Sequence, residues 1–198
     1  MPITTTTKLQ AVNTMLATIG TAPVNTLSGT NSADVAMASQ TLDEVSLAVQ
    51  SKGWHWNTEV KELSPDSITG QIVVGNNVVM CDVDFPDNGD LDIVLRNTKL
   101  YDRAAQTSVF TKALRAKTIT ALEWEDIPQA ARSYIMIRAS RIFQDRVVGS
   151  EKHHSFTLRD ELTALQNLRR LEGETGDHTI FDNYDVYRVI DRQYPNTY

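Results

Sequence analysis

The sequence predicts an α+β protein that is mainly helical: a four-helix bundle, a small antiparallel β lobe inserted into it, and an extended C-terminal tail. Apolar residues recur at helical spacing before residue 50 and again after residue 128, whereas the chain between them shows short apolar runs separated by turn sequences. Beyond residue 173 the apolar periodicity is low. The predicted units are therefore residues 1–53 and 126–173 for the bundle, 54–125 for the lobe and 174–198 for the tail.

The first two helices are predicted from the N-terminal apolar spacing. A short helix begins near Thr7 and stops at Gly20, with its apolar stripe formed by Leu9, Val12, Leu16 and Ile19. A longer helix begins at Ser32, which can cap its start, and ends at Gly53. Its narrow apolar seam contains Val35, Ala38, Leu42, Val45 and Val49.

Strands are predicted in the middle of the chain. Residues 72–74 and 78–80 flank a Gly-Asn-Asn turn and read as a hairpin. A tight turn at residues 87–90 precedes a strand within 91–96, and residues 116–124 supply another strand in which Trp124 points inward. Together these strands form a small antiparallel sheet.

Two more helices follow the strands. For the first, Asp126 can cap the start, Pro128 lies in the first turn and Gly149 follows the end. Its core-facing residues are Ala131, Ile135, Ala139 and Ile142. The last helix runs from Ser155 to Gly173, and its repeating leucines are Leu158, Leu162, Leu165 and Leu168.

Composition excludes several classes of protein. A net charge of -6 and a pI near 5.2 argue against sequence-independent nucleic-acid binding, which needs clustered cations. Cys81 is the single cysteine, so no internal disulfide forms, and no Cys/His cluster indicates zinc. We expect no metal or cofactor. The sequence shows neither a signal peptide nor a membrane span, so we expect a soluble, cytosolic product with no membrane partner.

Two features are candidate interfaces. The third predicted helix carries Arg132, Arg138, Arg141 and Arg146. One interpretation is solvated arginines with buried stems; the other is a stripe that faces acidic residues of the second helix or of another subunit. Those acidic residues are Asp34, Asp43 and Glu44. The tail carries Tyr184, Tyr187, Tyr194 and Tyr198, a composition typical of docking segments.

Catalytic and metal-binding signatures are sparse. No P-loop, GxGxxG, HExxH, GxSxG or EF-hand pattern occurs. Glu123, Glu125 and Asp126 lie around Trp124 and offer the carboxylates of a glycoside hydrolase, but helix capping and an inward tryptophan explain them as structure. His153 and His154 are adjacent, so on a helix their side chains diverge by about 100° and do not share a metal.

The segment Trp54-His55-Trp56 poses a similar choice. Together with Trp124, the two tryptophans are either a carbohydrate-binding surface or the packing between the lobe and the helices. On a strand, Trp54 and Trp56 lie on one face and His55 on the other. Two large rings on one face favour packing, so the three tryptophans are predicted to form the junction between the two parts.

Several stretches, in order over roughly residues 9–150, resemble the tail tubular protein A family of short-tailed phages. The stretches are "LQAVNTMLATIGTAPVNTL", "ADVAMASQTLDEVSLAVQSKGWHWNTE", "YDR" at residues 101–103, and "DIPQAARSYIMIRASRIFQDRVVGS". After residue 150 the resemblance is one of general character only.

The resemblance implies a structural virion protein of the tail, assembled in the host cytoplasm, with no catalytic residues. Its implied partners are further copies of itself in a ring of twelve, the portal protein, the nozzle protein (tail tubular protein B) and the tail fibre protein. Double-stranded DNA passes through such a ring without specific binding, and the acidic composition fits a wall that repels it. The alternative function is a virion-associated polysaccharide or peptidoglycan hydrolase.

Overall fold

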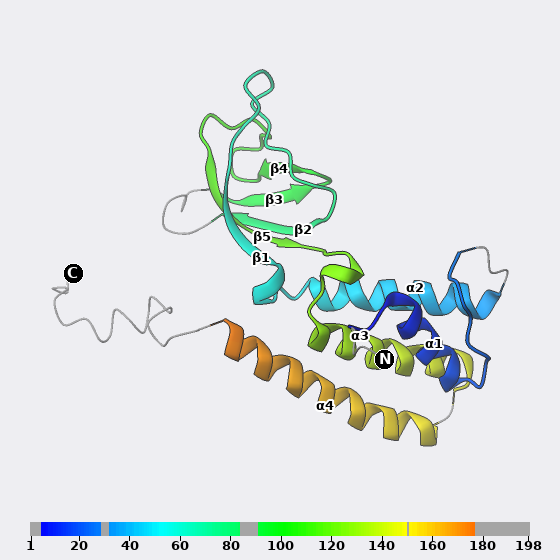
Figure 1. Ribbon diagram of the computed structural model, residues 1–198. Coiled ribbons are helices and arrows are strands. Elements are labelled where there is room, and N and C mark those ends of the chain that lie inside the picture. Colours follow the sequence, from blue (N-terminus) through cyan, green and yellow to red (C-terminus); the bar gives the residue numbers. More distant parts are fainter. Residues whose placement is uncertain (1–4, 29–31, 84–90, 150, 177–198) are drawn as a thin grey trace, which may run out of the picture.

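The computed structural model describes residues 5–28, 32–83, 91–149 and 151–176, with side chains omitted for 151–157 (Figure 1). The four helices are α1 (Lys8–Thr18), α2 (Ala33–Gln50), α3 (Gln129–Val147) and α4 (Glu151–Thr175). The strands are β1 (Thr58–Leu63), β2 (Val78–Val83), β3 (Ile93–Arg96), β4 (Lys99–Asp102) and β5 (Leu114–Thr120). Two 3-10 turns, η1 (His55–Asn57) and η2 (Trp124–Asp126), lie where the chain passes between helices and strands. The mixed α+β class is confirmed.

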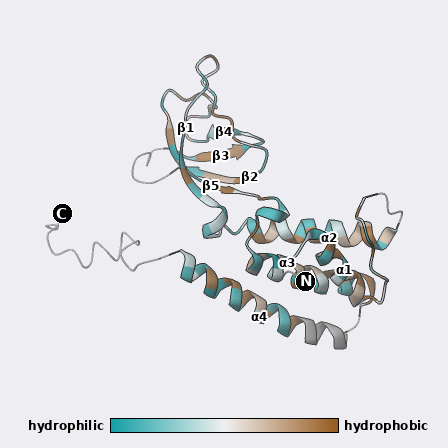
Figure 2. Cartoon of the chain, viewed as in Figure 1, coloured by the Kyte–Doolittle hydropathy of each residue, from teal (hydrophilic) through white to brown (hydrophobic). Residues whose placement is uncertain are grey.

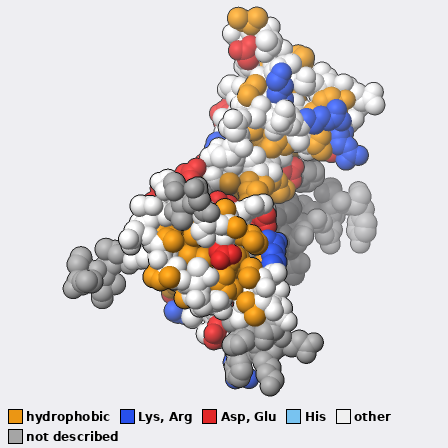
Figure 3. Space-filling view, turned by 90° about the vertical axis from the view of Figure 1, so that its right-hand side faces the viewer, with side chains coloured by type: hydrophobic (Ala, Val, Ile, Leu, Met, Phe, Trp, Pro, Cys, Tyr) orange, Lys and Arg blue, Asp and Glu red, His pale blue; other side chains and the backbone are white. Residues whose placement is uncertain are grey.

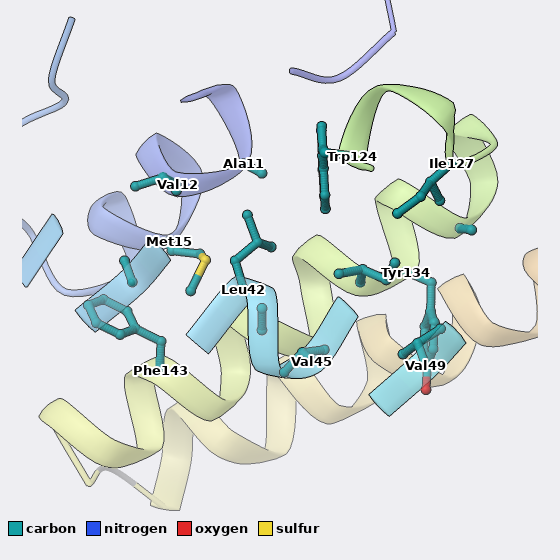
Figure 4. Packing of buried hydrophobic residues seen from close by; sticks show 14 of the residues in the cluster. Ala11, Val12, Met15, Leu42, Val45, Val49, Trp124, Ile127, Tyr134 and Phe143 are labelled. Atoms are coloured by element: carbon teal, nitrogen blue, oxygen red, sulfur yellow. The ribbon is translucent and has the colours of Figure 1, made fainter. Parts of the chain in front are cut away.

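Among the helices, α3 makes extensive contact with each of the others. Helices α1 and α2 also pack on one another, whereas α4 packs chiefly along α3. Side chains of α1, α2 and α3 converge in the helical core, where Met15, Leu42 and Phe143 lie together (Figure 4). Ala164 and Leu168 join this core from α4. The structure therefore does not confirm the predicted four-helix bundle, because α4 lies on one helix of a three-helix core.

Of two predicted helix caps, Ser32 occupies the predicted position without the capping bond, and Asp126 is wrong. The Ser32 side chain makes no capping hydrogen bond at the start of α2, although its backbone is extended there. Asp126 lies within η2, and Pro128 occupies the capping position of α3. The reason is steric: the residue before a proline avoids helical geometry, and Ile127 is extended with φ -75° and ψ 134°. A helix starting directly after Asp126 is therefore disfavoured.

Helix α1 begins next to Thr7, as predicted, and a capping box closes its start. The Thr7 side chain accepts a hydrogen bond from the Gln10 backbone N–H at 3.2 Å, and the Gln10 side chain accepts one from the Thr7 N–H at 3.0 Å. This reciprocal pair satisfies two backbone donors at the start of the helix. Gly20, at φ 77°, follows the end of α1 as expected.

The sheet differs from the predicted hairpin. Strand β5 lies between β1 and β2 and pairs antiparallel with both, while β3 and β4 form a separate hairpin. Residues 72–74 do not pair with β2, because their backbone bonds run to residues 98–100: the Val74 N–H donates to the Thr98 carbonyl and the Leu100 N–H to the Ile72 carbonyl. Gln71 and Val73 form isolated bridges with Val109 and Lys99. The strand predicted at 116–124 ends at Thr120, and the turn predicted at 87–90 lies outside the described residues.

A second hydrophobic core belongs to the strands. It contains Ile72, Cys81, Ile93, Leu100, Phe110, Leu114 and Ala116. It shares no residue with the helical core, and hydrophobic residues occur in both parts of the chain (Figure 2). Burial raises the pKa of the Cys81 thiol to about 11, so this cysteine stays protonated at neutral pH. None of the described helices is long and apolar enough to cross a bilayer.

Candidate functional site at the helix–sheet junction

Two buried amides tie together the two chain passages between helices and sheet. The Gln50 side chain accepts a hydrogen bond from the Leu122 N–H at 2.7 Å and donates to the Leu122 carbonyl at 3.2 Å. The Asn57 amide donates to the carbonyls of Gln50 at 2.9 Å and Thr120 at 3.1 Å. Each amide side chain belongs to a residue that is 2% exposed. Because buried polar groups are costly to leave unpaired, these bonds fix how the strands sit relative to the helices.

Trp54 and Trp56 lie beside these amides and pack against the helical core. The Trp54 indole N–H donates to the Val49 carbonyl at 2.8 Å, and the Trp54 backbone N–H donates to Asn57 Oδ1 at 2.8 Å. The expectation that these residues form a strand is wrong: residues 55–57 make the 3-10 turn η1, so the alternation of strand faces does not apply. The Trp56 indole N–H is buried without a hydrogen-bond partner in the described part of the chain.

Trp124 lies at the second passage between sheet and helices, between β5 and α3. It lies in η2 rather than on a strand, is 6% exposed, and its indole N–H donates to the Thr6 carbonyl at 2.9 Å. The Thr6 backbone N–H donates to the Gln129 side chain at 2.8 Å. A carbohydrate-binding surface needs exposed rings, so the burial of Trp124 removes it from that candidate site.

Arg132 is buried and, like Trp124, donates to the Thr6 carbonyl. It is 6% exposed, and its Nε donates to the Ile127 carbonyl at 2.6 Å. Its Nη1 donates to the Thr6 carbonyl at 3.2 Å and its Nη2 to the Glu125 carbonyl. The guanidinium thus joins the N-terminal segment, η2 and the start of α3. The guanidinium of Arg132 is therefore bonded within the subunit, and an interface role for this residue stays a prediction.

Two of the carboxylates considered for hydrolysis line a small cavity. Glu123 and Glu125 line a cavity of about 200 Å³. Lys8 and Asp43 line the same cavity and form an ion pair at 2.7 Å across α1 and α2. Ligand pockets usually measure about 300–1,000 Å³, so this cavity is small for a sugar chain. Among the described residues no group of three or more His, Cys, Asp or Glu side chains can hold a metal. The side chains of His153 and His154 lie outside the described part of the chain.

The arginine stripe of α3 makes its main contacts within the chain. Glu161 of α4 is 6% exposed and binds two arginines: Arg141 Nε at 2.5 Å and Arg138 Nη1 at 2.9 Å. Hydrogen bonding to Glu161 raises the pKa of Arg141. Arg146 binds Glu44 of α2 at 3.0 Å, and this bond lowers the pKa of Glu44. The structure therefore shows an intrachain match of the stripe with acidic residues, in part with those of α2.

A partner-facing role for Arg138 and Arg141 stays a prediction. The Arg138 side chain is 34% exposed and also donates to the Tyr134 hydroxyl at 3.1 Å. Tyr184, Tyr187, Tyr194 and Tyr198 lie outside the described residues. Glu161, Gln50 and Asn57 were not predicted from the sequence. Of the three, only Glu161 stands in a recognisable pattern, because a charged residue lies there at helical spacing from Leu158 and Leu165.

Comparison with known protein families matches residues 9–178 to the family described as Tail tubular protein. The chain belongs to the tail tubular protein family. It is therefore a structural protein of the podophage tail, located in the virion, as the resemblance of its N-terminal stretches implied. The family is structural rather than enzymatic, which fits a non-enzymatic role. A comparison with curated proteins finds no match.

A groove lies between α1, α3 and α4 of this tail tubular protein. It measures about 750 Å³ and is open to solvent. Its floor is the α3 face that carries Ala130, Ser133 and Ile137. The groove exists because α4 packs along α3 without closing onto α1. Hydrophobic side chains also reach the surface of both parts of the molecule (Figure 3).

Proposed function

We propose that this tail tubular protein is of type A and acts as the adaptor at the head-to-tail junction. Twelve copies form a closed ring that joins the portal to the nozzle, surrounds the DNA path and helps to attach the tail fibres. The subunits assemble in the host cytoplasm. The observation that carries the proposal is the family match over residues 9–178, together with the type A stretches found in order from residue 9 to 150.

The junction supports this role mechanically. An adaptor transmits position between two partners, so its two parts need a fixed relative orientation. The bonds of Gln50 and Asn57 supply such a connection, since both residues are buried and bond to residues 120–122, far along the chain. The net charge of -6 supports a channel wall that does not hold passing DNA.

The tyrosine-rich tail is proposed as the strap that docks on the portal. Tyrosine provides large contact area at a small cost in side-chain entropy. Removal of residues 176–198 should abolish co-sedimentation with purified portal protein while the circular dichroism spectrum and melting temperature stay unchanged. A truncated protein that still co-sediments with portal would exclude the strap.

The adaptor role itself is tested by sedimentation of the full chain with the portal protein. We expect a stable complex containing as many copies of this chain as of the portal subunit. The same run with the nozzle protein in place of the portal tests the other end of the adaptor. A chain that binds neither the portal nor the nozzle protein would refute the adaptor role.

A further inference from the structure

Helix α4 carries a row of leucines that α3 does not cover. Leu158 is 39% exposed, Leu162 is 53% exposed, and Leu165 lies half-buried at the border of the helical core. The spacing i, i+4, i+7 places the three side chains along one flank of the helix. The exposed Arg169 continues this row by another turn. We call Leu158, Leu162, Leu165 and Arg169 the leucine ridge.

The opposite flank of α4 borders the groove already described. Asp160, Thr163, Ala164, Asn167 and Leu171 line it from α4. At 3.6 residues per turn, Asp160 and Leu162 point in directions about 160° apart, so ridge and groove lie on different sides of the same helix. A subunit with two such faces has the arrangement that head-to-tail rings require, in which each copy uses one face toward each neighbour.

The two faces match in shape. The ridge is convex and built from leucines. The groove is concave, and its lining is dominated by small or hydroxyl-bearing side chains: Thr14, Thr18, Ala130, Ser133, Ser140, Thr163 and Ala164. Its volume of about 750 Å³ is that of roughly 25 water molecules, which is ample for the ridge side chains. Leucine side chains entering a groove between helices follow the usual ridge-into-groove packing of helices.

The faces also match in charge. Asp160 and Arg170 line the groove, and Arg170 is already paired with Glu174 at 2.7 Å, whereas Arg169 lies on the ridge. Exposed ion pairs contribute little to affinity, but they select register and orientation. A second copy of this chain therefore offers the groove an apolar row and a cation that can face Asp160.

We infer that neighbouring subunits pack through α4, with the leucine ridge of one copy seated in the α1–α3–α4 groove of the next. The inference rests on the proposed ring and names its contact faces. Each α4 then packs on its own α3 and also beside the α1 and α3 of a neighbour, so the groove of each subunit is filled by the next subunit.

Cysteine cross-linking tests the contact directly. One variant carries Leu162→Cys and Ser133→Cys in the same chain; the native Cys81 is 5% exposed and protonated, so it does not react. Under conditions where the protein sediments as a ring, a short bismaleimide should produce a ladder of covalent oligomers on a denaturing gel. Each single variant should stay monomeric, because two ridges or two grooves do not meet. The control pair Leu162→Cys and Val60→Cys, with Val60 exposed on β1, should also give no ladder.

A substitution separates the contact from the fold. Leu162→Gln should lower the association constant at least about tenfold with an unchanged melting temperature, because the residue is exposed in the monomer. Leu47→Gln, at a 50% exposed leucine on α2, is the matched control and should leave association unchanged. A ring that forms without the cross-link ladder overturns the inferred faces and leaves the ring standing. If the introduced cysteines cross-link to the portal or nozzle protein and not to a second copy of this chain, the groove belongs to that partner and the inference is overturned. Absence of any ring would refute the proposed function and this inference together.

Discussion

Glu161 provides the sharpest test of how α4 is held. Its carboxylate is almost fully buried, yet it is satisfied by Arg141 at 2.5 Å and Arg138 at 2.9 Å, both from α3. Glu161→Gln keeps the size of the side chain but removes the charge that both guanidinium groups bind. The substitution therefore isolates the electrostatic part of the α3–α4 contact.

The size of the effect follows from burial. Removing one partner of a buried ion pair costs about 3–5 kcal/mol when the remaining charge is stranded. Here the remaining arginine side chains are 34% and 16% exposed, so water partly solvates them and the expected loss is smaller, about 2 kcal/mol. In a chain of this length, that loss corresponds to a fall in melting temperature of about 4–8 °C.

The assay is urea unfolding followed by circular dichroism, with Glu174→Gln as the control. Glu174 binds Arg170 at 2.7 Å through side chains that are 57% and 62% exposed, so its loss should cost under about 0.5 kcal/mol. Equal and small losses for the two variants would refute the reasoning that the buried carboxylate anchors α4. A large loss for Glu174→Gln alone would refute it as well.

Three further predictions concern the junction and the lobe. Gly53→Ala should destabilise the protein by at least about 1 kcal/mol more than Gly20→Ala. Both glycines have positive φ, but the added Cβ at Gly53 would lie 2.6 Å from Ile119 Cδ1, whereas Gly20 faces open space. Equal losses of stability in urea unfolding would contradict this prediction. Arg132→Lys should cost about 2–3 kcal/mol by the same assay, since one ammonium cannot reach all three carbonyls; a neutral result would show that the carbonyls find water. Hydrogen bonds from Thr69 and Ile68 lower the pKa of Asp66 below its ordinary 3.8. The loop is therefore ordered by the ionised carboxylate above pH 3.8, and this order is lost as the pH falls through the lowered pKa of Asp66. Amide exchange at residues 68–69 should accelerate as that order is lost, and Asp66→Asn should remove the pH dependence.

The helices were predictable because one periodic signal repeats many times. The seam of α2 and the start of α1 at Thr7 both follow from side-chain spacing and local capping, which depend only on nearby residues. The start of α3 was misjudged at Asp126 because the restriction that Pro128 places on Ile127 outweighs the capping preference of an aspartate.

The junction was only partly predictable. The tryptophans are visible in the sequence, but the amides that order them are not. Gln50 bonds to a residue 72 positions away and Arg132 to one 126 positions away, and no local pattern specifies such partners. Residues 72–74 were misassigned for a related reason, since they bond to residues 98–100 and no local pattern specifies that partner.

The central claim is that this tail tubular protein is a ring-forming adaptor at the portal. Electron microscopy of the purified full chain mixed with its portal protein tests it most directly. We expect a collar of twelve-fold symmetry on one face of the portal. Portal particles without added density, beside a persistent monomer of this chain, would contradict it.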